Sequence, residues 1–306
     1  MTHALGRARS RTHGLVAVSA ALLGLALFGG APASLFAAPA PPPQFPESDF
    51  EIEGPIQAIG VPPGTITVMG VTIEVPAGTP IATPTADGLA LADLLGASFL
   101  GRSSTGFLGG TGIILGSTNA DGTIEAEDVF VEVAENVLLG PLTANTIPSG
   151  GNLGAPGTTF AVLGTVVMPT GDPRLPLVKT IEGFNLNLGS VPPGTLVVAE
   201  GYFGSDGILY AHTIEAGAGT VVGPANQTSI TRAICQPGGR LEVRGASTTA
   251  SVVTLLGRTQ TAVLDPETGL ASFRFRIPTG QVGGCPSTVT VTNSNGSSAT
   301  ASVEIL

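Results

Sequence analysis

One histidine in this sequence is a candidate general base. His212 is the only histidine beyond residue 13. A histidine base needs a nucleophile or a second acid–base group within reach, and the Gly-x-Ser-x-Gly elbow that presents a serine nucleophile is absent. We therefore interpret His212 as a surface strand residue, assign no catalytic residue, and expect a protein that is not an enzyme.

Carboxylates are the second group with possible chemistry, and they are densest between Asp121 and Glu135. Carboxylate oxygens are the ligands that Ca²⁺ prefers. The weak candidate ligands in this run are Asp121, Glu125, Glu127 and Asp128. The Asp-x-Asp-x-Asp-Gly spacing of a calcium loop is absent, so we predict a solvated acidic face without metal or other cofactor. Calcium or small-ligand binding remains the alternative.

Charge is distributed unevenly along the chain and argues against nucleic acid as a partner. Residues 47–215 contain 18 acidic residues and three basic ones, a net charge of −15, whereas residues 232–306 contain six arginines and four acidic residues. A negative surface repels phosphate, and single-stranded nucleic acid needs basic grooves with stacking rings. The chain has no tryptophan and two tyrosines. We therefore expect no nucleic-acid binding, and the scarcity of aromatic platforms also disfavours a sugar site.

Two Asp-Gly turns organise the elements around these residues. Asp121 and Gly122 lie 85 residues before Asp206 and Gly207. Asp-Gly between apolar-alternating runs predicts a tight hairpin, because glycine adopts the positive φ that the turn needs. The strand-like segments 65–70 and 159–164 also echo each other, and the apolar phase changes across Gly70, which predicts a turn or bulge there. The middle of the chain therefore reads as a tandem repeat of β units.

These motifs resemble a known family. The order of a T-x-x-V-x-G strand, a loop, a G-T-x-V-x-x-x-G strand and a D-G-x-x-x-A-x-x-I hairpin is similar to domain of unknown function 5666, over roughly residues 50–215. The resemblance implies small OB-like β-barrels, often in tandem, in exported bacterial proteins. It supplies no catalytic residue. The first unit departs from the pattern, since its strand at 111–116 contains an extra glycine and its middle segment is long.

The C-terminal part of the chain reads as a third unit built of short strands. Seven candidate strands are 230–235, 240–244, 251–256, 260–264, 271–277, 288–292 and 299–306. Seven short strands in fewer than ninety residues indicate an immunoglobulin-like sandwich, and the segment weakly resembles the Ig-like modules of bacterial surface proteins. Cys235 and Cys285 are predicted to form a disulfide that joins the loop after the first strand to the turn at Cys285. Two buried free thiols are the alternative.

The N-terminus has the order of a secretory signal. Three arginines precede an uncharged apolar run at 14–28, and small residues follow. This run is shorter than the roughly 20 residues that a membrane span prefers, so we expect cleavage after Ala33 or Ala37 and no membrane span afterwards. An uncleaved anchor is the alternative. The expected location is the periplasm or the surface of a bacterium.

Together these features predict an all-β protein with two tandem OB-like β-barrels and an immunoglobulin-like β-sandwich. The expected units are a signal peptide at 1–38, a proline-rich linker at 39–48, barrel repeats at 49–134 and 135–218, and the sandwich at 219–306. We expect a non-enzymatic exported protein with a structural or protein-binding role in the envelope. Its partner, an unknown protein or envelope component, and its oligomeric state do not follow from the residues.

Overall fold

The computed structural model describes residues 48–266 and 268–306, and this part of the chain is built almost wholly from β-strands. The described helical turns are of the 3₁₀ type: η1 (Leu91–Leu95), η2 (Leu188–Ser190) and η3 (Thr279–Gln281). The all-β prediction is confirmed. Within the described residues, no helix has the length and apolar character needed to cross a membrane. The predicted signal peptide and nearly all of the proline-rich linker lie outside the described residues.

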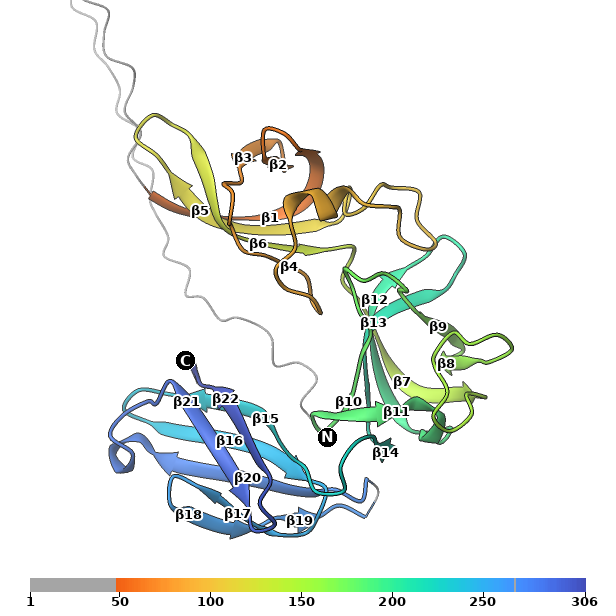
Figure 1. The fold of residues 1–306 in the computed structure, drawn as a ribbon, viewed down its shortest axis with the longest axis vertical. Helices are drawn as coiled ribbons and strands as arrows, with labels where there is room; N and C mark the ends of the chain where they lie inside the picture. Colours follow the sequence, from red (N-terminus) through yellow and green to blue (C-terminus); the bar gives the residue numbers. More distant parts are fainter. Residues whose placement is uncertain (1–47, 267) are drawn as a thin grey trace, which may run out of the picture.

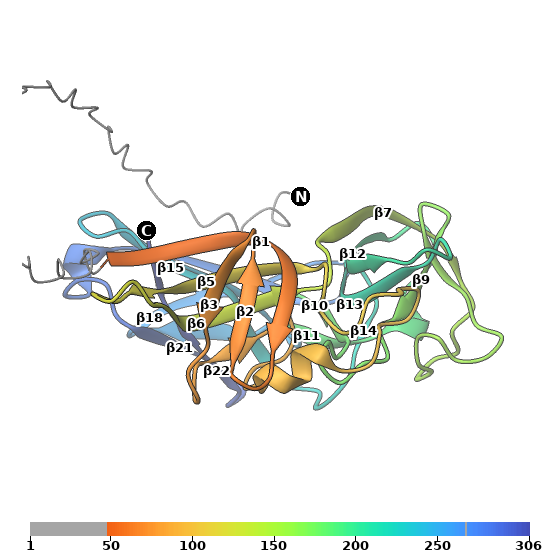
Figure 2. The ribbon, with the colours of Figure 1, turned by 90° about the horizontal axis from the view of Figure 1, so that it is seen from above.

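The first unit is a closed five-stranded barrel, shown in orange and yellow in Figure 1. Its strands are β1 (Ser48–Gly60), β2 (Thr65–Val68), β3 (Val71–Glu74), β5 (Thr111–Thr118) and β6 (Ile124–Glu132). They are hydrogen-bonded in the order β3-β2-β1-β5-β6, and the pairing of Glu74 with Glu125 connects β3 back to β6. A short sixth strand, β4 (Ile81–Ala82), runs parallel to β6 outside this ring. The connection from β4 to β5 carries η1 and extends towards the second unit (Figure 2).

The second unit contains a ring of five strands with the same order of pairings. Its sheet comprises β7 (Asn136–Asn145), β8 (Phe160–Val162), β9 (Thr165–Pro169), β10 (Val178–Ile181), β11 (Phe184–Asn187), β12 (Leu196–Phe203), β13 (Leu209–Ala216) and β14 (Thr220–Val221). The ring β9-β8-β7-β12-β13 matches β3-β2-β1-β5-β6 strand for strand, since β9 and β3 each run parallel to the last strand. Strands β10, β11 and β14 extend the sheet to residue 221, slightly beyond the predicted boundary at 218.

Two-residue turns explain the phase change that the sequence shows at Gly70. Met69-Gly70 and Leu163-Gly164 both have φ angles of 51° and 83°, the pair of positive values that a type I′ turn requires. Each turn places its apolar side chain over a glycine of the neighbouring strand. A Cβ on Gly54 would lie 2.4 Å from Met69, and one on Gly140 would lie 2.4 Å from Leu163. The predicted turn at Gly70 is confirmed.

Both Asp-Gly sequences form hairpin turns, and each hairpin contains a β-bulge. The turns at 119–123 and 204–208 connect β5 to β6 and β12 to β13, and Asp121 Oδ1 accepts a hydrogen bond from the Thr123 amide at 2.9 Å. The bulges leave Glu127 and His212 as the extra residues opposite a glycine. The glycine is needed because a Cβ at Gly116 or Gly201 would lie 2.0 Å from a carbonyl oxygen across the pair.

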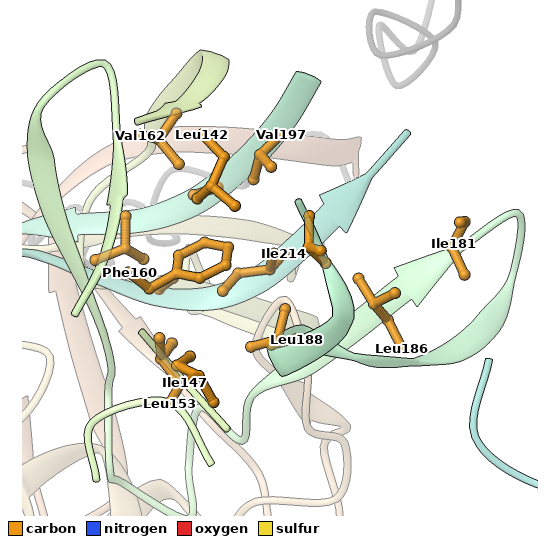
Figure 3. Close-up of a cluster of buried hydrophobic side chains, with 14 of the residues drawn as sticks. Leu142, Ile147, Leu153, Phe160, Val162, Ile181, Leu186, Leu188, Val197 and Ile214 are labelled. Carbon is orange, nitrogen blue, oxygen red and sulfur yellow. The ribbon is translucent and has the colours of Figure 1, made fainter. Parts of the chain in front are cut away.

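Apolar side chains fill the second ring and extend to the strands beside it (Figure 3). Leu142, Val162 and Val197 from three ring strands point towards Phe160 and Ile214, and all five are almost completely buried. The alternation of burial along the strands directs these residues inward, as the period of two predicts. Removal of this apolar surface from water is the main stabilising contribution to the unit.

The third unit consists of two sheets packed around a separate core. Its strands are β15 (Thr228–Cys235), β16 (Arg240–Ser247), β17 (Val252–Leu255), β18 (Arg258–Thr261), β19 (Val263–Leu264), β20 (Ala271–Pro278), β21 (Thr288–Asn293), β22 (Ser298–Ser302) and β23 (Glu304–Ile305). The sheets have the orders β19-β20-β16-β15-β23 and β18-β17-β21-β22. The predicted strands at 260–264 and 299–306 each divide in two, because the chain passes from one sheet to the other within them.

A disulfide joins Cys235 to Cys285 across 50 positions of sequence, with the Cα atoms 5.7 Å apart. Cys235 ends β15 and is completely buried, whereas Cys285 lies in the segment between η3 and β21. The disulfide therefore fixes the end of the first strand of this unit to a segment that has little regular structure of its own, as predicted.

Candidate functional site

The two barrels meet through an arginine that belongs to the second unit. Arg174 lies between β9 and β10, and its guanidinium donates hydrogen bonds to the carbonyl oxygens of Asp93 and Ala97 at 2.9 and 2.8 Å. Both acceptors belong to the long connection of the first unit. The guanidinium carbon also lies 4.3 Å from the ring centroid of Phe99 and 5.6 Å from that of Phe107. Arg174 thus combines hydrogen bonding with cation–π contacts across the boundary.

A carboxylate neutralises this arginine within the second unit. Asp172 accepts hydrogen bonds from Arg174 Nε at 2.8 Å and from Nη2 at 2.6 Å, and the two side chains are only 16% and 9% exposed. These hydrogen bonds lower the pKa of Asp172 below its ordinary value. The carbonyl of Arg174 accepts a further bond from Thr83 Oγ1 of the first unit at 2.8 Å. The arginine is therefore held on both sides of the boundary.

Aromatic rings complete the same contact, which we call the inter-barrel junction (Asp93, Ala97, Phe99, Phe107, Asp172, Arg174, Tyr202 and Tyr210). Tyr202 lies 5.8 Å from Phe99 and is stacked on Tyr210 at 5.3 Å between centroids. The Tyr210 hydroxyl donates to Asp206 Oδ2 at 2.7 Å, which raises the pKa of Tyr210 to about 12. The second Asp-Gly turn, read from the sequence as a hairpin signal, therefore also anchors a ring of the junction.

Acidic side chains gather on the outer face of β1, β5 and β6. In-register partners on neighbouring strands point to the same side of a sheet, and Glu51, Leu115 and Asp128 are such partners. We call this surface the acidic face; its carboxylates belong to Asp49, Glu51, Glu53, Glu125, Glu127, Asp128 and Glu132. These three strands contribute no basic side chain to it.

The acidic face does not assemble a metal site in the described part of the chain. No group of three or more histidine, cysteine, aspartate or glutamate side chains is placed to hold a metal ion there. Among the weak candidates, Asp121 lies in the turn, Glu125 lies on β6, and the bulge places Glu127 beside Asp128 at the exposed surface. The carboxylates follow the strand rather than converge on one point.

At the end of the acidic face nearest the second barrel, Glu132 has an unusual pKa. Burial raises the pKa of Glu132 from 4.5 to about 7, with further increases from the negative charges of Glu135, Glu200 and Glu53. Because the folded state binds this proton more tightly than the unfolded state, ionisation of Glu132 costs stability as the pH rises from about 4.5 to about 7. The cost is fully present above that window.

We expect Glu132→Gln to raise the free energy of unfolding at pH 8 by about 1 kcal/mol, after allowance for solvent screening, and to leave it almost unchanged at pH 4.5. Chemical denaturation of both proteins across this pH range measures the difference. Glu304→Gln, at an exposed position of the third unit, controls for the loss of one negative charge. If the free energy of unfolding of Glu132→Gln and that of the parent change in parallel with pH, the prediction is contradicted.

His212, the candidate base, is enclosed at the bulge of β13. Its side chain is 7% exposed, and Nδ1 lies 3.0 Å from Thr213 Oγ1. Burial lowers its pKa to about 4, so the imidazole is neutral at physiological pH. The prediction of a strand residue is confirmed, but the predicted surface position is wrong, because His212 is the extra residue of the bulge in β13 and its side chain is enclosed.

A second charged surface, of opposite sign, covers the outer side of β15, β16 and β20. Arg232, Arg244 and Arg274 are in-register neighbours there, and Glu242 pairs with Arg276 one step along. We call this surface the arginine face; the described strands β15, β16 and β20 contribute to it Arg232, Arg240, Arg244, Arg274, Arg276 and the carboxylate of Glu242. Five of the six arginines after residue 231 thus lie on one side of one sheet.

Glu242 holds three of these arginines in place. It accepts hydrogen bonds from Arg244 Nε at 2.6 Å, from Arg274 Nη2 at 2.8 and 2.9 Å, and from Arg276 Nε at 3.3 Å. The carboxylate is only 4% exposed, and burial by itself would raise its pKa, yet the bonds and charges of Arg274 and Arg244 lower the pKa to about 2. The side chains of Arg274 and Arg276 remain 39% and 49% exposed.

The sequence does not reveal either the junction or the arginine face as a unit. Arg174 is one of only three basic residues among residues 47–215, which are strongly acidic. Because basic residues are so rare in this region, the presence of Arg174 indicates that it has a buried partner. The arginine face does follow from alternation along the strand at 271–278, where Arg274 and Arg276 point away from the core. Register between strands, which brings Arg232 and Glu242 to the same face, requires the structure.

Comparison with known families gives a match over part of the first unit. Residues 53–103 match the family model for a domain of unknown function, DUF5666. The matched segment runs from β1 through η1 and ends before β5. Neither a curated protein nor a solved structure matches the chain.

Proposed function

We propose that this chain is an exported, non-enzymatic protein of the bacterial envelope that acts as a structural or protein-binding scaffold. The observation that carries the proposal is the inter-barrel junction. It places Phe99, Phe107, Tyr202 and Tyr210 in one hydrophobic cluster that spans both barrels. Such a continuous core joins two units into one rigid body, whereas a catalytic cleft between domains needs an open boundary. A rigid body with charged outer faces suits a binding or spacing role.

The non-enzymatic part of the proposal is supported by His212 and by the carboxylates. An enclosed neutral imidazole at a bulge cannot exchange protons readily with a substrate, and the carboxylates of the acidic face are spread along a strand. Glu132, whose pKa is near neutrality, is surrounded by other carboxylates and has no nucleophile among the neighbours that shift its pKa. Perturbed pKa values also arise in structural charge clusters.

We also propose that the two barrels are tandem copies of one repeat and that the third unit is an Ig-like module. Identical pairing orders, matching turns at Gly70 and Gly164, and bulges opposite Gly116 and Gly201 support the repeat. Two packed β-sheets with a common core support the Ig-like assignment. Repeated units of this kind are commonly used as spacers and binding platforms rather than as single active sites.

Cell fractionation tests the exported location. The full chain, tagged at its C-terminus, is expected in the periplasmic or surface fraction of a bacterium, with the mass of a chain that begins after Ala33 or Ala37. A variant without residues 1–38 is the control and should stay in the cytoplasm. Recovery of the unprocessed full chain from the cytoplasm would contradict the proposal.

Thermal unfolding in EDTA and then in millimolar Ca²⁺ tests the scaffold role against calcium binding. A ligand that binds only the folded state must raise the melting temperature by mass action. We expect the melting temperature to be the same in both solutions. An increase of several degrees that is lost in Asp128→Asn would instead favour a calcium-binding protein.

A further inference from the structure

The arginine face has the properties of a prepared binding surface. Its five arginines and one glutamate give a net charge of +4 on one side of the neighbouring strands β15, β16 and β20. Glu242 orients three guanidinium groups, so less side-chain entropy is lost when they bind an anion than for free surface arginines. Arginine is also the basic residue most suited to bidentate contacts with carboxylates.

The arginine face borders an interface that the chain already uses. Along the same side of β16, Ala246 packs into the core cluster of the second barrel, and Ser229 on β15 donates a hydrogen bond to the Glu182 carbonyl at 2.5 Å. The arginines begin one register step beyond this contact. A partner seated on the arginine face would therefore continue an existing protein–protein contact.

A complementary surface is present in the same sequence. The acidic face carries seven carboxylates on three strands, and six of them are residues other than the partly protonated Glu132. A shallow hollow on this face is lined by Asp49, Phe50, Glu51, Leu115, Gly116 and Glu127, and so offers both carboxylate and apolar groups. A guanidinium group fits such a site well, because its edge binds carboxylates and its flat face tolerates apolar contact.

We propose that the arginine face of one copy binds the acidic face of a second copy, so that the chains associate head to tail. This inference rests on the proposed scaffold function and names its partner as a second copy of the chain. Within one molecule, the first barrel and the third unit occupy opposite ends of an arc with the second barrel between them (Figure 1). The inter-barrel junction and the Ser229 contact hold this arrangement.

A contact between two different faces leaves one of each kind free at the ends of the assembly. Repetition of such a contact produces a ring or an open filament rather than a closed two-fold dimer. The attraction is electrostatic, so it weakens as salt shortens the Debye length from about 30 Å at 0.01 M to about 3 Å at 1 M. Head-to-tail assembly of an exported scaffold would extend its reach by one chain at each step.

Two variants, each altered on one face, test this directly. The arginine-face variant carries Arg232→Glu and Arg240→Glu, which bring the face to zero charge and spare the three arginines bonded to Glu242. The acidic-face variant carries Asp49→Arg, Glu127→Arg and Asp128→Arg, at exposed positions remote from Glu132. Circular dichroism and thermal unfolding confirm that each variant is folded.

Sedimentation velocity of the mature chain at low ionic strength provides the measurement. At about 100 µM, where a micromolar contact is saturated, we expect the parent to form species larger than a dimer and to dissociate in about 0.5 M salt. Each variant alone should be monomeric, with association at least tenfold weaker. An equimolar mixture should form a dimer and nothing larger, because each member retains one functional face.

A matched control carries Arg258→Glu, Thr259→Glu and Thr288→Glu on the other sheet of the third unit, with the same total change of charge. It should assemble within twofold of the parent. A monomeric parent, a monomeric mixture of the two variants, or equal loss of assembly in the control would each overturn the proposal. If the parent stays monomeric but binds dextran sulfate through the arginine face, the partner is a foreign polyanion. That result rejects self-association while the scaffold function, tested separately by export and calcium response, stands.

Discussion

Arg174→Ala should separate the two barrels and lower the free energy of unfolding by about 3–5 kcal/mol. The substitution removes the hydrogen bonds to Asp93 and Ala97 and the contacts with two aromatic rings, and it leaves the Asp172 carboxylate without its counter-charge in a nearly buried position. Loss of one partner of a buried ion pair is costly because the remaining charge stays desolvated. The variant is therefore expected to have a mobile boundary between barrels that remain folded.

Tyrosine fluorescence is the natural measurement, since Tyr202 and Tyr210 are the only tyrosines and the chain has no tryptophan. Both rings lie in the junction and belong to the hydrophobic cluster that it shares with the first barrel, so tyrosine signals report on this contact and on the core next to it. In Arg174→Ala we expect the tyrosine transition to occur at lower denaturant concentration than the far-ultraviolet transition. In the parent the two transitions should coincide for the barrels.

Two further substitutions separate the role of the guanidinium from that of positive charge. Arg174→Lys keeps the charge but cannot span both carbonyls and the carboxylate at once, and should recover only a minor part of the loss. Lys179→Ala removes a positive charge from β10, outside the junction, and should have little effect. Coincident transitions and unchanged stability in Arg174→Ala would show that the barrels are held together by other contacts.

Local sequence signals predicted the hairpins of this protein well. The Asp121 and Asp206 turns, the turn at Gly70 and the strands of the third unit depend on φ preferences and on alternation within a few residues. These are properties of short segments. The conformation of these segments does not depend on the rest of the chain, so it can be predicted from the local sequence.

The junction and the full extent of the charged faces could not be predicted from short segments, because they depend on loops and on the register between strands. Arg174 contacts residues 77 and 81 positions earlier, and nothing in its neighbours specifies that distance. The division of the segment 260–264 between two sheets likewise follows from packing around buried Ala262 and not from strand propensity. His212 was correctly assigned to a strand but wrongly to the surface, because its burial follows from the bulge and not from its residue type.

Replacement of both cysteines of the third unit, Cys235→Ser with Cys285→Ser, should lower the free energy of unfolding of that unit by about 4 kcal/mol. The bond closes a loop of 50 residues, and its loss returns the entropy of that loop to the unfolded chain. Single domains of this size are stable by roughly 5–15 kcal/mol, so much of the stability of the unit depends on the bond. Far-ultraviolet circular dichroism during denaturation measures the effect.

Reduction of the parent protein by a membrane-permeable or soluble phosphine should lower the free energy of unfolding of the third unit as much as the double substitution does. The tyrosine transition of the barrels should be unchanged in both cases. The Cys235 position is completely buried beside β16, so serine there also adds the cost of an enclosed hydroxyl, and Cys235→Ala with Cys285→Ala distinguishes the two contributions. If the alanine pair is as stable as the oxidised parent, the bond does not stabilise the unit. If it is less stable, as we expect, folding of the third unit depends on an oxidising compartment, which connects its stability to the export that we propose.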